Sequence, residues 1–395
     1  MVLTNGCREL PVTTTDWPVA VTGSKGGIQY SMAFREITIG LPVSLTGKYC
    51  AQGRQVFEAV NLFVGYVNKE GGLQIGSGSR LPVKLIHRDD RSRTGVAEEI
   101  VGKLLDEDRV DILFGPYSSG LTMAAARIAQ QRGKVLWNHG GSSDEIFKQG
   151  WRYLVSAISP ASDYFRHLPR LLLCGAPALK RLCIIKASNS KFAAHIGRGL
   201  SEGAEESGFE PPQEISFHSP IADPGTIIER LSDLEPDALV LAGSFQDDVS
   251  LVKQRHLFPK TIRRIAAVAA GVQAFAEELG PYSNEVIGPS QWEPTVEHEK
   301  IIGPDCDWFA QNFKERYGKP PDYMAAGAFA VGIILQECAR RAGSLIDDDL
   351  RQVAAELDIH TLYGRFKIDP ETGRQVGHKI HLVQWQDGRS NLLLS

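Results

Sequence analysis

From Glu36 onward, short runs of β-branched and apolar residues alternate with stretches that have the amphipathic period of a helix. Residues 37–41 and 83–86 are typical of strands, and residues 55–68 between them place apolar side chains on one helical face. A parallel sheet requires this alternation, because each strand is joined to the next by a helical crossover. The sequence therefore predicts an α/β fold.

The same pattern begins again after residues 151–155 and continues for a similar length. It is followed by three further helical stretches and by two strands at residues 363–368 and 379–385, which we expect to pair through the turn at 369–373. The chain of 395 residues is long enough for two or three packed units. We therefore expect two α/β lobes of similar size.

Charge and cysteine usage exclude several classes of partner. The chain has 43 Lys and Arg against 47 Asp and Glu, with no basic block that would bind nucleic acid. Its six cysteines lie far apart, without the spacing of a metal site. We expect no nucleic-acid partner, no metal and no cofactor, and we favour buried free thiols over a disulfide.

Residues 1–35 are rich in Thr, Gly and Ser and differ from the rest of the chain. They contain no basic start followed by an apolar stretch, so no export signal is visible in this chain. No apolar run anywhere approaches the roughly 20 residues that span a bilayer. We expect a flexible N-terminal segment over residues 1–35 and no membrane-spanning helix.

The segment at residues 115–122 leaves one predicted strand and enters a helix, and it reads GPYSSGLT. Its hydroxyls and free backbone N–H groups would lie at a helix N-terminus, which favours an anionic group. Tyr117, Ser118 and Ser119 are therefore candidates for ligand binding. Serine is also common as a helix cap for stability alone, and that alternative stays open.

A second loop of this type, NHGGSSD at residues 138–144, also follows a strand. Loops at the carboxyl edge of a parallel sheet are where ligands of open α/β folds bind, so the two loops point to one cleft. Gly140 and Gly141 would let the backbone approach a ligand, and Ser142 could donate a hydroxyl. A bare turn with a Ser or Asp cap is the alternative. His139 has no recognisable catalytic partner, so we favour a neutral side chain in the pocket wall or a cap.

Several segments in order along the chain resemble the solute-binding proteins of branched-chain amino acid transporters. They include ITIGLPVSLTG at residues 37–47, NKEGG at 68–72, GPYSS at 115–119 and DPETG at 369–373. The resemblance extends from about residue 36 to residue 385. It implies two Rossmann-like lobes of the type I periplasmic-binding-protein fold, joined by three crossovers and closing around one small ligand.

The resemblance also implies where the lobes divide. The crossovers would fall near residues 158–163, 287–291 and 360–364. The first lobe would comprise residues 36–158 and 288–360. The second lobe would comprise residues 159–287 and 361–395.

In that family the first lobe holds the ligand carboxylate through residues that match Ser119, Gly140 and Ser142, with Gln52 at a contacting position. The second lobe of amino-acid binders adds aromatic side chains and an acid for the ligand ammonium. This chain has other residues around the matching positions: Lys191, Phe192, Ser244, Phe245, Ala269 and Ala270.

Without that acid, a buried ammonium would lose its hydration and gain no counter-charge. We therefore expect a carboxylate, an amide or an aromatic acid rather than an α-amino acid. Phe192, Phe245 and Trp292 are candidate apolar walls, with ordinary core packing as the alternative. If an ammonium is bound after all, Asp163 or Asp247 would have to supply the charge.

The predicted function is that of a non-enzymatic, periplasmic binding protein, which traps a small ligand and presents it to the membrane permease of an ABC transporter. A monomer or a weak dimer is expected. A cytoplasmic amide or amino-acid sensor of the same fold is the alternative. A serine hydrolase using Ser119 and His139 is a distant one, because the chain lacks a nucleophile elbow.

Overall fold

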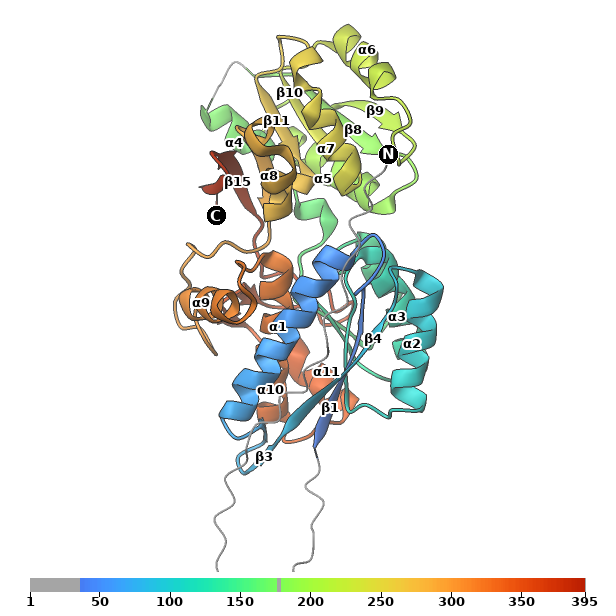
Figure 1. Ribbon diagram of the computed structural model, residues 1–395, viewed down its shortest axis with the longest axis vertical. Helices are drawn as coiled ribbons and strands as arrows, with labels where there is room; N and C mark the ends of the chain where they lie inside the picture. Colours follow the sequence, from blue (N-terminus) through green and yellow to red (C-terminus); the bar gives the residue numbers. More distant parts are fainter. Residues whose placement is uncertain (1–35, 176–178, 395) are drawn as a thin grey trace, which may run out of the picture.

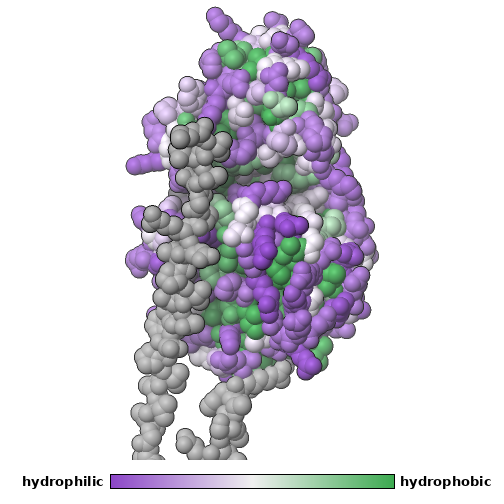
Figure 2. All heavy atoms as spheres, turned by 45° about the vertical axis from the view of Figure 1, so that its right-hand side comes forward, coloured by the Kyte–Doolittle hydropathy of each residue, from purple (hydrophilic) through white to green (hydrophobic). Residues whose placement is uncertain are grey.

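The computed structural model describes residues 36–175 and 179–394, which form two α/β lobes stacked along the long axis of the molecule (Figure 1). The expected flexible segment 1–35 lies outside the described residues. Hydrophilic residues cover most of the face shown in Figure 2, and the hydrophobic residues there lie in separate patches. Among the described residues, no helix has both the length and the apolar character that crossing a bilayer requires.

The first lobe is built on a five-stranded parallel sheet in the order β4-β1-β5-β6-β7. Its strands are β1 (Ile37–Val43), β4 (Val83–Asp89), β5 (Ile112–Phe114), β6 (Leu136–Asn138) and β7 (Leu154–Ser156). A small hairpin of β2 (Leu73–Ile75) and β3 (Ser79–Leu81) follows the first helix. The predicted alternation of strands and helices is confirmed.

Six helices cover this sheet, and three of them come from a distant part of the chain. They are α1 (Cys50–Lys69), α2 (Thr94–Asp106), α3 (Ser119–Gln131), α9 (Cys306–Tyr317), α10 (Tyr323–Ala342) and α11 (Asp347–Glu356). Helix α10 is buried along most of its length and packs against α1. A Cβ atom on Gly332 of α10 would lie 2.4 Å from the ring of Phe63, so this close approach requires glycine.

The second lobe has a seven-stranded sheet in the order β16-β15-β12-β11-β10-β8-β9. Its strands are β8 (Leu182–Ala187), β9 (Gln213–Phe217), β10 (Ala238–Ala242), β11 (Arg264–Ala267), β12 (Val286–Ser290), β15 (His381–Gln386) and β16 (Arg389–Leu394). Its helices are α4 (Leu168–Gly175), α5 (Lys191–Glu206), α6 (Pro224–Leu234), α7 (Phe245–Lys253) and α8 (Gln273–Leu279). Strands β8 to β12 are parallel, whereas β15 and β16 extend the sheet antiparallel.

The chain crosses between the lobes three times. The second crossing lies at the end of the expected range 287–291, because residues 286–290 form strand β12 of the second sheet and the chain leaves that lobe only after Ser290. The third crossing comes after Gln375 instead of at 360–364, because Phe366 and Ile368 belong to the core of the first lobe. The expected lobe boundary at residue 361 is therefore too early.

The expected pairing of the two late strands is also wrong. Residues 364–366 form β14, which pairs with β13 (Ile359–Thr361) inside the first lobe. Strand β15 pairs instead with β12 and β16. Pairing between strands depends on contacts that are distant in sequence, so a local pattern identifies a strand but does not identify its partner.

One glutamine joins the three crossings. The side-chain oxygen of Gln291 accepts a hydrogen bond from the backbone N–H of Ser159 at 3.0 Å, and its amide nitrogen donates to the Ser159 carbonyl at 3.2 Å. The ring of His378 lies 2.8 Å from the backbone oxygen of Gln291. Gln291 is almost completely buried, so these bonds are shielded from water.

Candidate functional site

Two loops meet at the carboxyl edge of the first sheet, as the sequence predicts. One follows β5 and the other follows β6, and these strands are neighbours. The hydroxyl oxygen of Ser119 accepts hydrogen bonds from the backbone N–H groups of Ser142, at 3.3 Å, and Ser143, at 3.0 Å. Ser119 thus ties the two loops together.

The backbone at the start of α3 is strained. Ser118 has a φ of 84°, which few residues other than glycine adopt. Its side chain caps the helix by accepting a hydrogen bond from Leu121 N–H at 3.5 Å. The capping alternative therefore applies to Ser118, whereas the hydroxyl of Ser119 contacts the neighbouring loop.

Gly140 and Gly141 were expected to let the backbone approach a ligand, but in the structure it is neighbouring protein atoms that leave no room for a side chain at either position. A Cβ atom on Gly140 would lie 2.8 Å from both the carbonyl oxygen of Pro116 and the Cα atom of Tyr117. A Cβ on Gly141 would lie 2.5 Å from the side chain of Thr122. The neighbouring loop fills the space on this side of both glycines, so they allow two loops to pack against each other.

His139 follows β6 and is fully buried. Burial lowers its pKa to about 4, so the ring is neutral at pH 7. Among the described residues, no hydrogen bond joins His139 to Ser119, whose oxygen already accepts two backbone N–H groups. This geometry fits the expected neutral side chain and does not form the Ser–His pair of a hydrolase.

Tyr164 contacts the hydroxyl of Ser142 and lies in a group of tyrosines that come from four separate segments of the chain. The hydroxyl of Tyr164, which belongs to the core of the second lobe, donates a long hydrogen bond of 3.3 Å to the Ser142 oxygen. Gln291 and Tyr323 lie close enough to the Tyr164 hydroxyl to lower its pKa against the larger effect of burial. Tyr117 and Tyr363 complete the group, and Tyr117 packs edge-on against Tyr49 with ring centroids 5.5 Å apart.

Burial raises the pKa of Tyr117, Tyr164, Tyr323 and Tyr363, so all four hydroxyls keep their protons at neutral pH. The hydroxyl of Tyr363 is buried and has no hydrogen-bond partner among the described residues. Of this group, only Tyr117 is predicted as a site residue from the sequence. No local signal marks the others, because the fold brings them together from the first crossing, the start of α10 and the turn after β13.

Gln52 and Trp292, two further candidates in the first lobe, have different surroundings. Gln52 lies in the first turn of α1, and its buried side-chain oxygen has no partner among the described residues. Trp292 is only 4% exposed and packs edge-on against Phe309 in the core. It also lines a surface groove of about 470 Å³ along α9. Its burial in the core of the first lobe fits core packing, the alternative for Trp292.

Of the second-lobe candidates, those at the start of α5 contact this region. Phe192, in the first turn of α5, packs edge-on against Tyr164 with ring centroids 5.5 Å apart. The neighbouring Lys191 side chain is 80% exposed and lies 3.8 Å from Glu145 of the first lobe. Phe245 begins α7 and is half-buried against the core. Ala270 is buried in the turn after β11, where its carbonyl accepts a hydrogen bond of 2.7 Å from the indole of Trp385.

Asp247 and Asp163, the two acids expected to pair with a ligand ammonium if one is bound, differ in how far their carboxylates are already hydrogen-bonded. The carboxylate of Asp247 accepts hydrogen bonds from Ser219, Ile221 and Ser244, and these bonds outweigh burial and hold its pKa below the usual value. It therefore serves the capping box of α7. Asp163 lies at the first crossing, where burial raises its pKa.

Asp322 is a further acid near these tyrosines, and it is not among the residues predicted from the sequence. One of its oxygens caps α10 by accepting the backbone N–H groups of Met324 and Ala325. Burial raises its pKa to about 6, and its charge acts on Tyr117, Tyr323 and Tyr363. An acid before a helix is a common cap, so its sequence position carries no sign of a nearby site.

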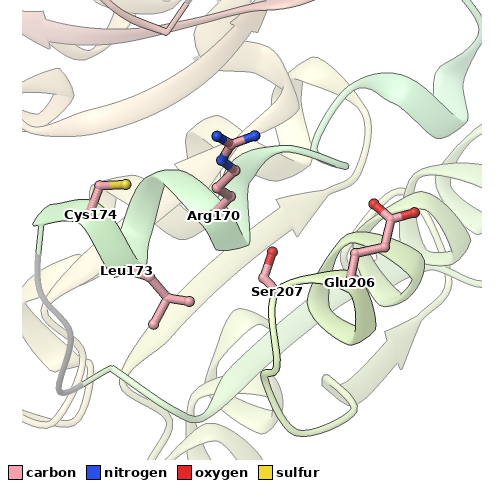
Figure 3. A pocket seen from close by; sticks show the side chains of 5 residues that line it. All are labelled: Arg170, Leu173, Cys174, Glu206 and Ser207. Carbon is pink, nitrogen blue, oxygen red and sulfur yellow. The ribbon is translucent and has the colours of Figure 1, made fainter.

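A separate hollow of about 480 Å³ lies in the second lobe, far along α5 from Phe192. Arg170, Leu173 and Cys174 of α4 line it together with Glu206 and Ser207 at the end of α5 (Figure 3). It contains none of the residues that the sequence predicts for ligand binding. Nowhere in residues 36–175 and 179–394 do three His, Cys, Asp or Glu side chains gather as a metal site would need.

Comparison with known proteins agrees with this architecture. The chain is 22% identical over 373 residues to Leu/Ile/Val-binding protein homolog 7 of Brucella abortus. The alignment covers 90% of this chain and 91% of that protein. The structure is similar to that of the branched-chain amino acid transporter substrate-binding protein LivJ from Streptococcus pneumoniae in complex with isoleucine. The TM-score is 0.76 at 20% identity, and the match covers 90% of this chain and 98% of that one.

A second similar structure is an ABC transporter solute-binding protein from R. palustris in complex with benzoate. Its TM-score is 0.74 at 19% identity, and the match covers 91% of this chain and 96% of that one. At these identities the structural matches show the fold, which is the two-lobed type I fold expected from the sequence. Residues 36–390, nearly all of the described chain, match the family model described as periplasmic binding protein, and the chain therefore belongs to the periplasmic binding protein family.

Proposed function

We propose that this protein captures a small solute between its two lobes and delivers it to the membrane permease of an ABC transporter, acting in the periplasm. The main supporting observation is that Ser119 and Ser142 of the first lobe lie together where Tyr164 of the second lobe makes contact. A solute held there would touch both lobes and so favour the closed state.

In this proposal the polar groups of the first lobe bind the head of the solute. The hydroxyls of Ser119 and Ser142 donate hydrogen bonds, and the amide N–H groups of Gln52, whose side-chain oxygen has no partner among the described residues, are further donors. Phe192 and Phe245, at the starts of α5 and α7, would cover the apolar body of the solute. His139 and the glycines shape the loops from behind.

We propose further that the solute lacks an α-ammonium group. Ala269 and Ala270 occupy the turn after β11, and Asp247 is fully used by hydrogen bonds within its own lobe. Burial of an ammonium there would cost several kcal/mol even after relaxation. The similar R. palustris protein was solved with benzoate, an acid without an ammonium, which is in keeping with this ligand class.

A calorimetric screen of amino acids, amides and aromatic or branched carboxylates tests both parts of the proposal. A solute that binds tightly should raise the unfolding temperature and, in small-angle scattering, reduce the radius of gyration. Submicromolar binding of leucine, with no tighter acid or amide, would refute the ligand class and direct attention to Asp322 or Asp163. If no solute in a broad screen binds or changes the scattering profile, the transport function itself is wrong. Light scattering coupled to size-exclusion chromatography should show that the protein is a monomer or a weak dimer.

A further inference from the structure

We propose that Asp248 is a positioning residue whose buried carboxylate holds two loops of the second lobe together, so that solute affinity depends on its charge. The inference rests on the proposed function, in which these loops lie over the solute, and it adds a form of regulation to that site. Asp248 acts through the loops and does not touch the solute.

The two loops lie at the carboxyl edge of the second sheet. Strands β10 and β11 are parallel neighbours, so the segments that follow them begin at the same edge. The segment after β10 leads through Gly243 to Phe245, the candidate wall at the start of α7. The segment after β11 contains Ala269 and Ala270. In the proposed function both loops therefore border the solute.

The carboxylate of Asp248 bonds to both loops. One oxygen accepts a hydrogen bond from the backbone N–H of Gly243 at 2.9 Å, and the other accepts one from the N–H of Ala269 at 3.0 Å. A Cβ atom on Gly243 would lie 3.0 Å from the first of these oxygens, so glycine permits the close approach. Asp248 is 1% exposed, so water does not replace these bonds. One carboxylate thus ties two loops together, as the Ser119 hydroxyl does in the first lobe.

The adjacent carboxylate extends this arrangement to a third loop. Asp247 accepts hydrogen bonds from Ser219 and Ile221, in the segment after β9, and from Ser244. Two consecutive acids in the first turn of α7 therefore connect the loops after β9, β10 and β11. Acids in this position are common helix caps, so the sequence alone does not mark Asp248 as a residue of the site.

The charge of Asp248 matters because each of its oxygens accepts a backbone N–H. An ionised carboxylate only accepts hydrogen bonds, whereas a protonated one carries a hydrogen on one oxygen. Protonation therefore weakens one of the two bonds and loosens the contact between the loops. Burial is the main cause that raises the pKa of Asp248 to about 7, and the N–H groups of Ala269 and Gly243 oppose it. Both forms of the carboxyl are therefore present near neutral pH.

The charged group that acts on Asp248 is its neighbour Asp247, whose charge raises the pKa further. The other charged side chains on and around α7 are exposed or bound elsewhere. Glu277, Glu278 and His218 are exposed, Lys253 pairs with Glu278, and Arg255 bonds to the carbonyls of Tyr282 and Asn284. Because the solute favours the ordered loops and so the ionised carboxylate, its affinity should fall as the pH falls through 7.

The test measures solute affinity by calorimetry at pH 8 and pH 6. The probe is the tightest binder among benzoate, isovalerate, benzamide and leucine, whose charges hardly change in this range. If one hydrogen bond gives the ionised form about a fivefold advantage, wild-type affinity should fall about threefold from pH 8 to pH 6. D248N has one acceptor oxygen at every pH, so it should bind about four- to fivefold more weakly than the wild type at pH 8 and within about twofold of it at pH 6.

D237N is the matched control. Asp237 also accepts two backbone N–H groups, those of Lys180 and Arg181, but it precedes β10 and so lies at the opposite edge of the same sheet. D237N should keep both the wild-type affinity and its dependence on pH. A loss of affinity in D248N that has the same size at pH 8 and pH 6 would indicate general damage to the fold and overturn the proposal.

The wild-type protein also tests the proposal without D248N, should that variant fail to fold. An affinity that is constant between pH 8 and pH 6 would overturn it. D322N removes another buried acid with a raised pKa, Asp322, whose pKa is about 6. The fall in affinity should persist in D322N, and its disappearance there would assign the pH dependence to Asp322 and overturn the proposal.

The inference and the transport function fail differently. If a solute binds and compacts the protein but D248N matches the wild type at both pH values, the inference about Asp248 is wrong and the transport function stands. If neither these probes nor any solute of the broad screen binds, the transport function is wrong and the inference falls with it.

Discussion

Arg198 on α5 of the second lobe forms an ion pair with Asp144, which follows the Ser142 loop in the first lobe. The other oxygen of Asp144 accepts the backbone N–H of Ser162, at the first crossing. The Asp144 side chain is buried and that of Arg198 is half-exposed. The lobes are therefore held together by a charged contact close to the loop that carries Ser142.

Loss of this ion pair should favour the open state. R198A leaves the buried carboxylate of Asp144 without its cation, and because Arg198 is half-exposed we expect a shift of about 1 kcal/mol in the closing equilibrium. Small-angle scattering of the solute-free protein should give a larger radius of gyration than the wild type. R132A, which removes an ion pair with Asp106 inside the first lobe, should leave the radius unchanged. Equal radii for R198A and the wild type would show that the pair does not hold the lobes.

Ser119 should contribute to binding both directly and through its loop. S119A removes a hydroxyl that could donate to the solute and the acceptor for Ser142 and Ser143 N–H. Affinity for the tightest solute found in the screen should fall by roughly 1 to 3 kcal/mol, measured by calorimetry. S201A, which removes a helix hydroxyl bonded to the Gly197 carbonyl, serves as the control. Unchanged affinity in both S119A and S142A would remove these loops from the binding site.

The buried ring of His378 should make stability depend on pH. Burial lowers its pKa to about 3, against an ordinary value near 6.5 in the unfolded chain. As the pH falls, the unfolded state therefore binds a proton before the folded state does. The stability that the neutral, buried ring of His378 contributes is complete above about pH 6.5 and is lost as the pH falls towards 3. The loss approaches about 1.4 kcal/mol per pH unit for one group.

Denaturant unfolding at pH 7 and pH 4.5 measures this effect in the wild type and in H378N. The difference between the two proteins isolates His378 from other buried groups, such as Asp248, whose pKa burial raises to about 7. H378N should lose less stability than the wild type on acidification. A loss of the same size in both proteins would mean that His378 does not titrate on unfolding.

The contact between α1 and α10 should tolerate no side chain at Gly332. A Cβ there meets the ring of Phe63 at 2.4 Å, so G332A should destabilise the protein by about 1 to 3 kcal/mol through overpacking. G102A is the matched control, because Gly102 is inside α2 and a Cβ there meets nothing within 4 Å. G102A should be neutral or stabilise by up to about 1 kcal/mol. Equal unfolding temperatures for the two variants would contradict this account of the helix contact.

Local periodicity predicts most of the strands and helices, because burial of one face leaves a period of 2 or 3.6 in the sequence. It also predicts that the Ser119 and Ser142 loops meet, since both follow neighbouring parallel strands. The partner of β15 and the position of the third crossing were not predictable in this way. Both depend on contacts between residues far apart, such as Ile287 with Gln384 in the pairing of β12 with β15.

The same limit applies to the site. Tyr164, Tyr323 and Tyr363 have no common spacing, and only the folded chain brings them close to one another, with Tyr164 against Ser142. Gly140 was predicted for its lack of a side chain, but the reason lies in the neighbouring loop at Pro116. The sequence therefore indicates which positions need a particular residue type, whereas the structure shows which neighbouring atoms make that residue type necessary.

Strands β15 and β16 complete the second sheet, yet they follow every helix of the first lobe along the chain. Likewise, α9 to α11 cover the first sheet but follow the strands β8 to β12 of the second. During synthesis, neither lobe can close its core until almost the whole described length has emerged from the ribosome. A chain of this topology therefore leaves apolar surface of both cores uncovered until late in its synthesis.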